Sequence, residues 1–327
     1  MIDLEEDEGL ESPAAPEHEV RSAIAQGDWH GWRLDKVLVA MAPEFSRSHL
    51  QGLIDQELVF LDGACAGLAS RKVKAGQSVQ VELRPTAESL AFRAEHLALK
   101  VVFEDEHVLV VDKPAGLVVH PAPGHWSGTL LNGLLAYHPA SVHLPRAGIV
   151  HRLDKDTSGL MMVGKTLQAV TALSRAIASR DVQRLYMALV HGAVPPGFTA
   201  VEARVGRDPG SRIRMAVHPS GRPARTDVQT LASAQGFTAV RCRLHTGRTH
   251  QIRVHLAHIG YPLVGDRLYG GTAELGLERQ ALHAWKLAFD HPVHGEPLEF
   301  VRPAPTDLSR AWEVVAPGIS PDDLQPP

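Results

Sequence analysis

The segment HRLDKDTSGL, residues 151–160, restricts most what this chain can fold into. Its first six positions carry Arg152, Asp154, Lys155 and Asp156. Apolar runs enclose it, AGIV before and LMMVG after, and both are typical of buried strands. A carboxylate held between such strands needs nearby cations, so we expect Asp154 to stay ionised and to act as a nucleophile or base. The stretch alone leaves open a second interpretation, a charged turn held by structural salt bridges.

The composition is that of one or two globular domains. The chain has 327 residues, of which 44% are hydrophobic, and only two cysteines, Cys65 and Cys242. We therefore expect no disulfide framework, a cytoplasmic location and no membrane span. The acidic, Pro/Ala-rich start predicts a disordered tail over residues 1–28 rather than a signal peptide. Without the eight acids of its first 20 residues, the formal net charge changes from −4 to +4, which permits an anionic partner.

Residues 29–84 predict a small α/β module. Apolar residues at helical spacing predict a helix that starts near Leu34 and ends before Pro43. Ser46 is a typical N-cap for a second helix. Asp62-Gly63 predicts a hairpin turn, and the alternating run QSVQVEL predicts a closing strand.

Many short strands and few helices are expected after this module. Residues 85–97 lack a clean period and read as a linker, residues 98–317 as the main domain and residues 318–327 as a C-terminal tail. The run LQAVTALSRAIAS at 167–179 is the longest amphipathic helix. Because strands and helices do not alternate regularly, we predict an α+β fold with a mixed, largely antiparallel sheet.

A second cluster of polar residues lies in HTGRTHQIRVHLAH, residues 245–258. Arg253 and His250 lie beside each other off the apolar stripe of a helix that Thr249 is expected to cap. Arg248 and the free amides of the first turn predict an anion site. No HExxH motif is present, and we predict no metal.

Tyr186 stands in the otherwise aliphatic stretch RLYMALVHG. It is either a core residue or a stacking surface for a base, and its position alone does not decide. The chain has neither a P-loop nor a GxGxxG or GxSxG motif, so we predict no cofactor.

Several blocks together resemble the RluA-type pseudouridine synthases. They are VFEDEHVLVVDKPAGLVVHP, AGIVHRLDKDTSGLMMVGKT, RLYMALVHG, RMAVHPSGRPARTDVQ, LHTGRTHQIRVHLAHIGYPLVGDRLYGG and RQALHAWKLAFDHPVHGEPLEF, in the family's order. The front module resembles the S4 RNA-binding domain. HPAPGHWSGTLLNGLLAYHP is similar to the RluD branch, which acts on helix 69 of 23S rRNA.

The resemblance implies an isomerase that breaks the N1–C1′ bond of a flipped uridine, turns the uracil and rejoins it through C5, without a cofactor. The family's catalytic aspartate falls on Asp154, its active-site tyrosine on Tyr186 and the arginine paired with the aspartate on Arg253. Arg152 matches an arginine that holds the flipped nucleotide. Attack on C1′ and a glycal route both remain open, and we prefer the glycal route. Asp156 is expected to shape the loop.

The expected partner is RNA, as 23S rRNA or the large ribosomal subunit, and not DNA; we expect a monomer. The front module is sparsely basic for an RNA binder, and RLYMALV has Leu185 where the family leads us to expect a polar residue. Alternatives are a synthase for another rRNA or tRNA site and a non-catalytic ribosome-assembly protein. The expected RNA contacts, each of which could instead be a solvated surface residue, are Arg33, Lys36, Arg47, Arg71, Lys72, Lys74 and Arg248.

Overall fold

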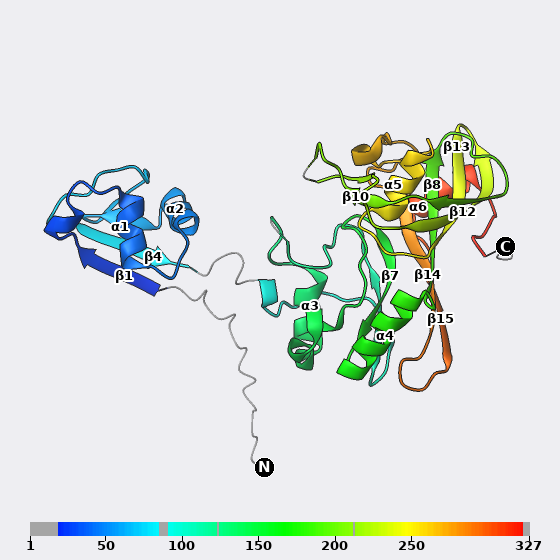
Figure 1. The fold of residues 1–327 in the computed structure, drawn as a ribbon, viewed down its shortest axis with the longest axis horizontal. Helices are drawn as coiled ribbons and strands as arrows, with labels where there is room; N and C mark the ends of the chain where they lie inside the picture. The colour runs from blue at the N-terminus through cyan, green and yellow to red at the C-terminus, as the bar shows by residue number, and fades with distance from the viewer. Residues whose placement is uncertain (1–18, 85–90, 123, 212, 323–327) are drawn as a thin grey trace, which may run out of the picture. The chain divides into compact units, whose positions relative to one another are not determined.

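The computed structural model describes residues 19–84, 91–122, 124–211 and 213–322. The chain forms two compact units, residues 1–90 and 91–327 (Figure 1). Within the described ranges, no helix is long and apolar enough to cross a membrane.

The first unit packs two helices on an antiparallel sheet whose strand order is β1-β4-β2-β3. Ser46 caps α2 by accepting a hydrogen bond from the His49 N–H, and the predicted turn at Asp62-Gly63 joins β2 to β3. Its elements are β1 (Glu19–Ile24), η1 (Gly27–Trp29), α1 (Leu34–Met41), α2 (Arg47–Asp55), β2 (Val59–Leu61), β3 (Ala64–Cys65) and β4 (Ser78–Leu83).

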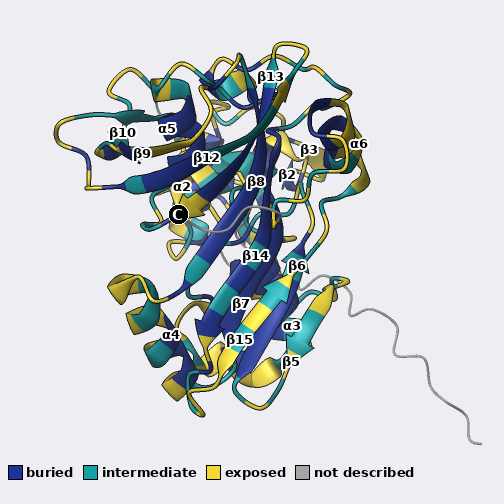
Figure 2. Ribbon diagram, turned by 90° about the vertical axis from the view of Figure 1, so that its right-hand side faces the viewer, coloured by how far each residue is buried: buried dark blue, intermediate teal, exposed yellow. Residues whose placement is uncertain are grey.

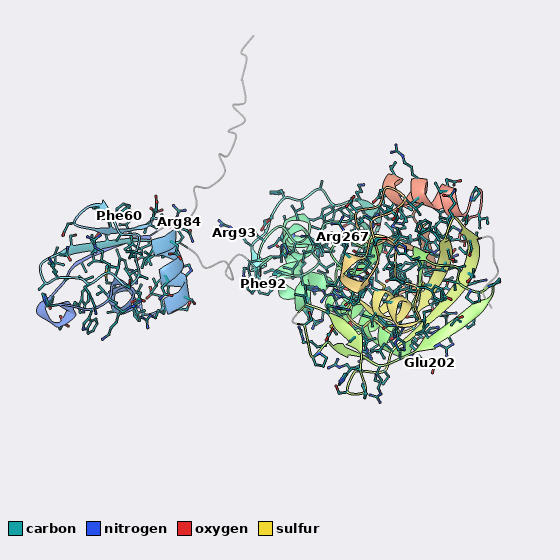
Figure 3. All side chains as sticks on the ribbon, turned by 90° about the horizontal axis from the view of Figure 1, so that it is seen from above. Phe60, Arg84, Phe92, Arg93, Glu202 and Arg267 are labelled. Carbon is teal, nitrogen blue, oxygen red and sulfur yellow. The ribbon has the colours of Figure 1, made fainter. Side chains whose placement is uncertain are left out.

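Three expectations about the ends of the units are wrong. The predicted tail over residues 1–28 is too long, because residues 19–24 form β1 and pair with β4; residues 1–18 lie outside the described residues. In the predicted linker, residues 91–97 pack on the second unit, where Asn132 Nδ2 donates to the Arg93 carbonyl at 2.8 Å. The exposed Phe92 and Arg93 are labelled in Figure 3. In the predicted C-terminal tail, the Ile319 carbonyl accepts a hydrogen bond from Trp312 Nε1 at 2.9 Å.

The second unit is built on a mixed sheet of nine strands among the described residues. Eight lie in the order β5-β6-β7-β14-β8-β13-β12-β9, and β15 pairs with β14. Only the β7–β14 pair is parallel in this sheet, so the predicted α+β class with a largely antiparallel sheet is confirmed. The nine strands are β5 (Val101–Glu104), β6 (Val108–Lys113), β7 (Ser158–Gly164), β8 (Gln183–His191), β9 (Phe198–Glu202), β12 (Arg225–Ala234), β13 (Phe237–Leu244), β14 (Leu282–Asp290) and β15 (Pro297–Val301). Two more strands, β10 (Val205–Arg207) and β11 (Met215–Val217), pair with each other in a separate sheet.

The helices cover a sheet whose central strands are buried (Figure 2). Alternation along β8 sends Tyr186 and Ala188 into the core under α3 and α5, while Leu185 and Met187 pack toward α6. The helices are α3 (Leu130–Tyr137), η3 (Pro139–His143), η4 (Pro145–Gly148), α4 (Leu167–Ser179), α5 (Gln251–His258), η5 (Arg267–Tyr269) and α6 (Thr306–Val315).

The apolar run AGIV before residues 151–160 is not the expected strand. Its first residues end the turn η4, and Ile149 makes a single bridge to Val163. The run LMMVG does lie in β7, where Gly159 has a φ of +117°. A Cβ at Gly159 would lie 2.2 Å from the Ala284 carbonyl oxygen, so glycine lets β14 approach β7 beside the functional segment.

Candidate active site

The segment that carries Asp154 is held in place by other parts of the chain, which donate hydrogen bonds to its backbone carbonyls. The Lys155 carbonyl accepts from Lys113 Nζ and from the Gly116 N–H, each at 2.9 Å. The Asp156 carbonyl accepts from Arg279 Nη1 at 3.0 Å. Lys113 is 1% exposed and donates to two further carbonyls as well, so all three of its ammonium protons are used. Asp154 therefore stands on a braced loop.

Arg253 is the cation that faces Asp154. Its Nη1 lies 3.2 Å from Asp154 Oδ2, while Nε and Nη2 bind both oxygens of Asp266 at 2.7 and 2.8 Å. Burial works to lower the pKa of Arg253, but the two carboxylates overcome it and raise that pKa. The sequence neighbours Arg152 and Lys155, which were expected to compensate Asp154, are exposed and make no ion pair with it among the described residues. The compensating charge comes from α5 instead.

The start of α5 differs from the prediction. His250, not Thr249, is the N-cap, with a left-handed φ of 55°. The Arg248 N–H already donates to Gln251 Oε1 at 3.0 Å, and Arg248 Nε donates to the Pro223 carbonyl. Of the predicted anion site, the Arg248 N–H and Nε therefore already have partners within the chain. His250 Nε2 instead lies 4.0 Å from Asp154 Oδ1, and burial lowers the pKa of His250.

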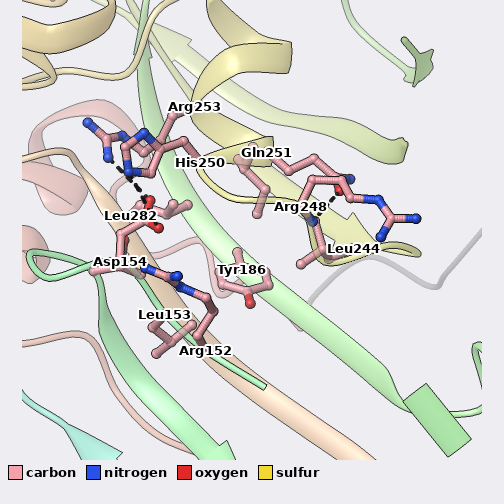
Figure 4. A pocket seen from close by; sticks show the side chains of 12 residues that line it. Arg152, Leu153, Asp154, Tyr186, Leu244, Arg248, His250, Gln251, Arg253 and Leu282 are labelled. Carbon is pink, nitrogen blue, oxygen red and sulfur yellow. Dashed lines mark hydrogen bonds and ion pairs between the residues drawn. The ribbon is translucent and has the colours of Figure 1, made fainter. Parts of the chain in front are cut away.

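Tyr186 lies in the same pocket as Asp154 (Figure 4). Its side chain is 4% exposed, and burial raises its pKa to about 12, so the phenol stays protonated at neutral pH. Figure 4 shows Asp154 with Arg253 and His250 on one side of Tyr186 and Arg248 on the other. The described residues that line the pocket are Arg152, Leu153, Asp154, Thr157, Tyr186, Leu244, Arg248, His250, Gln251, Ile252, Arg253 and Leu282.

Sequence comparison assigns this arrangement to a family. The family described as RNA pseudouridylate synthase matches residues 107–258, and the S4 domain matches residues 32–79. Ribosomal large subunit pseudouridine synthase D of Nitrosomonas europaea is 47% identical over 87% of this chain and 85% of its own length. The chain belongs to the RNA pseudouridylate synthase family. The synthase of the same name from Xanthomonas campestris is also 47% identical, over 89% of this chain and 91% of its own.

Solved structures agree with the assignment of this chain to the RNA pseudouridylate synthase family. Human RNA pseudouridylate synthase domain containing 1 is 27% identical, with a TM-score of 0.51 over 68% of this chain and 86% of its own. Human RNA pseudouridylate synthase domain containing 4 is 22% identical, with a TM-score of 0.52 over 65% of this chain and 92% of its own. At this identity, the similarity shows the fold alone. The expected resemblance to RluA-type enzymes with a front S4 domain is therefore confirmed, and the synthase is an isomerase.

The front S4 unit of the synthase brings its expected RNA contacts onto neighbouring elements. Arg33 and Arg47 both bind the fully buried Asp35, at 3.1 and 2.9 Å. Their hydrogen bonds, of which that from Arg33 has the largest effect, hold the pKa of Asp35 well below its usual range. The backbones of Lys72 and Arg33 form an isolated antiparallel β-bridge, and the Arg71 carbonyl accepts a hydrogen bond from the Leu34 N–H. Lys36 Nζ lies 3.5 Å from the centre of the Trp32 ring, and Lys74 is exposed.

Sequence reasoning missed two residues that hold the site. Asp266 anchors Arg253, and Lys113 braces the Asp154 loop. Both are buried charges, and a charge in a core is uncommon unless it is paired or hydrogen-bonded. The stretches around them, VGDRLYGG and VVDKPAG, contribute to the family resemblance but gave no separate signal that these two residues hold the site.

Proposed function

We propose that this synthase isomerises uridine to pseudouridine in 23S rRNA, in the stem-loop called helix 69, with Asp154 as its catalytic residue. The observation that carries the proposal is the buried Arg253 guanidinium 3.2 Å from the Asp154 carboxylate, in one pocket with Tyr186. The names of the relatives, ribosomal large subunit pseudouridine synthase D, support the rRNA substrate.

The target base must leave its stack to reach this pocket, which costs a few kcal/mol. The Tyr186 ring offers a face for the extruded uracil, and Arg152, exposed at the rim, takes part in holding the flipped nucleotide. Phosphate contacts by the S4 unit add affinity without reading the target base. These contacts offset the cost of extrusion.

The chemistry requires an ionised carboxylate beside the sugar. In the route that we favour, Asp154 takes the proton from C2′ while the C1′–N1 bond breaks and its electron pair leaves with the uracil. The uracil turns, C5 bonds to C1′ as C2′ regains the proton from Asp154, and the C5 proton is then lost while N1 takes up a proton, so that one proton moves in net from C5 to N1. Before the reaction, Arg253 keeps the Asp154 carboxylate ionised and aimed, so that it can accept the C2′ proton.

The test of the catalytic assignment is Asp154→Asn, with Asp156→Asn as the matched control. We expect Asp154→Asn to abolish pseudouridine formation while RNA affinity stays within severalfold, and Asp156→Asn to keep most activity, because the loop uses the Asp156 carbonyl rather than its carboxylate. Pseudouridine is measured by carbodiimide mapping. Conversion by Asp154→Asn would refute the assignment.

The substrate and the route need separate measurements. Total RNA from a strain that lacks the synthase should lose carbodiimide stops in helix 69; losses at another rRNA site or in tRNA would correct the substrate instead. Deuterium at C2′ of the target uridine should give a primary isotope effect on the glycal route and none on direct attack at C1′. The two results are independent of each other.

A further inference from the structure

A second cavity adjoins the pocket that holds Asp154 and Tyr186. It has a volume of about 480 Å³ and shares Arg152, Asp154, Leu244 and Arg248 with that pocket. Its further lining includes three arginines and three histidines, and Asp154 at the shared edge is the single carboxylate among the described lining residues. Such a surplus of positive charge favours an anionic ligand.

Arg184 is the buried cation of this cavity. Arg184 is only 4% exposed, yet its guanidinium makes no ion pair with any described residue. Nη2 reaches the Leu244 carbonyl at a long 3.4 Å, and Nε is buried without a hydrogen-bond partner among the described residues. A guanidinium cannot lose its charge at neutral pH, so burying it without an anion is costly. The missing anion is therefore expected from outside the chain.

Two histidines of the same cavity also have unsatisfied ring nitrogens. His120 Nε2 and His151 Nδ1 are buried and lack partners among the described residues. Burial and the charge of Arg152 lower the pKa of His120 to about 4, and burial lowers that of His151 to about 3. Both rings are neutral at pH 7. His151 Nδ1 carries the ring proton, because Nε2 accepts the Met162 N–H, and it can donate to a phosphate oxygen, whereas His120 Nε2 can donate to a phosphate oxygen or accept from a ribose hydroxyl. Unsatisfied buried polar atoms are rare in native proteins, so their concentration here indicates a ligand site.

The sheet register relates this site to the uridine pocket. Arg184 and Tyr186 lie two residues apart on β8 and so point to the same face, about 7 Å apart along the strand. The cavity rim carries the exposed Arg146 and Arg180. Arg146 has a left-handed φ of 53° and is followed by Ala147 at 52°, a strained pair that is typical of functional segments. A single small anion would leave these rim cations unused, whereas a nucleic-acid strand would reach them.

We propose that Arg184 binds one phosphodiester of the RNA strand next to the extruded uridine, with His120 and His151 facing the same nucleotide. This inference rests on the proposed function and adds to it the group that grips the backbone while Tyr186 holds the base. It also gives a reason for a buried cation that weakens the free fold: the charge is neutralised only in the complex.

The experiment uses the full chain in an Asp154→Asn background, so that binding is measured without turnover. The probe is a helix 69 stem-loop in which each phosphate flanking the target uridine is replaced, one at a time, by an uncharged methylphosphonate. Arg184→Gln should raise the Kd of the unmodified RNA roughly 30-fold and reduce the salt slope by about 0.7. At one flanking position, the methylphosphonate should weaken binding to the protein with Arg184 but not to Arg184→Gln.

Arg243→Gln is the matched control. This exposed arginine lies opposite Leu185 in the register of β13 and β8, but it lines a different cavity. It should leave the Kd unchanged within twofold. A structural arginine would lower Tm when replaced, whereas Arg184→Gln and Arg184→Met should keep or raise Tm, because they remove a buried charge without a partner. Arg184→Lys should recover part of the affinity.

Equal loss of affinity from every methylphosphonate in both proteins, or an unchanged Kd in Arg184→Gln, would overturn the inference. The proposed function is judged separately, by pseudouridine formation in the chain with Asp154. A chain that makes pseudouridine without the Arg184–phosphate coupling refutes only the inference. A chain that shows the coupling and makes no pseudouridine refutes only the function.

Discussion

Arg253 divides its guanidinium between two carboxylates, and the division decides which of them is available to a substrate. Nε and Nη2 bind Asp266 at 2.7 and 2.8 Å, and Nη1 lies 3.2 Å from Asp154. The fork geometry to Asp266 fixes the plane of the guanidinium. The centre of that group lies 4.9 Å from the centre of the Tyr269 ring, which packs against it. Asp154 thus receives a single hydrogen bond from Arg253, on Oδ2, and its Oδ1, with His250 Nε2 4.0 Å away, is left for chemistry.

Asp266→Asn should lower kcat by about 10- to 100-fold, with a smaller change in KM, because Arg253 loses its anchor and Asp154 loses its aim. Single-turnover conversion of an rRNA stem-loop measures the effect. Glu278→Gln is the matched control, since it removes an exposed carboxylate whose partner Arg267 is also exposed. An Asp266→Asn enzyme as active as the Glu278→Gln enzyme would show that Arg253 needs no anchor.

Lys113→Met should destabilise the second unit by about 3 kcal/mol, because three carbonyls lose a buried donor. Because one of these carbonyls belongs to Lys155, kcat should fall as well. Urea unfolding and turnover measure the two effects. Lys100→Met, which removes an exposed lysine, should change neither. A stable Lys113→Met enzyme with full activity would contradict the bracing role.

His151 should make the second unit sensitive to acid. Its Nε2 accepts the Met162 N–H at 3.0 Å, and burial lowers its pKa to about 3. An unfolded histidine titrates near pH 6.5, so the unfolded chain binds more protons as the pH falls below that value. This contribution to stability is complete above pH 6.5 and is lost as the pH falls toward 3, by about 2 kcal/mol at pH 5.

His151→Gln tests this pH dependence, because glutamine does not titrate. The difference between the free energies of unfolding at pH 8 and pH 5 should shrink by the stated amount. His143→Gln, at an exposed position, should leave that difference as in the parent protein. Equal pH dependence in all three proteins would rule out His151 as the titrating group.

Removal of residues 1–84 should weaken RNA affinity and the choice of site more than the chemical step. The S4 unit has its own core, and the described residues that line the pocket of Asp154 all belong to the second unit. We expect Kd to rise and the salt slope to fall, while kcat at saturating RNA changes little. Filter binding at two salt concentrations is the measurement. Unchanged affinity at physiological salt would refute an RNA-binding role for the front unit.

Local features of the molecule could be read from the sequence because they depend on near neighbours. The helix at 167–179 has the predicted ends, and Ser46 and Asp62-Gly63 form the expected cap and turn. The same reasoning failed where distant partners intervene. Residues 19–24 become a strand because β4 offers a free edge, and His250 displaces Thr249 as the cap of α5.

The sequence by itself determined the family, the class of fold and the identity of Asp154, Tyr186 and Arg253 as candidates, because short motifs and hydrophobic periods are local. Only the tertiary structure decided their partners. Asp154 and Arg253 are 99 residues apart, and their contact depends on the strand order that places β14 between β7 and β8. The charges that hold the site, such as Asp266, become recognisable only after folding, because burial turns an ordinary ion pair into one whose geometry is fixed.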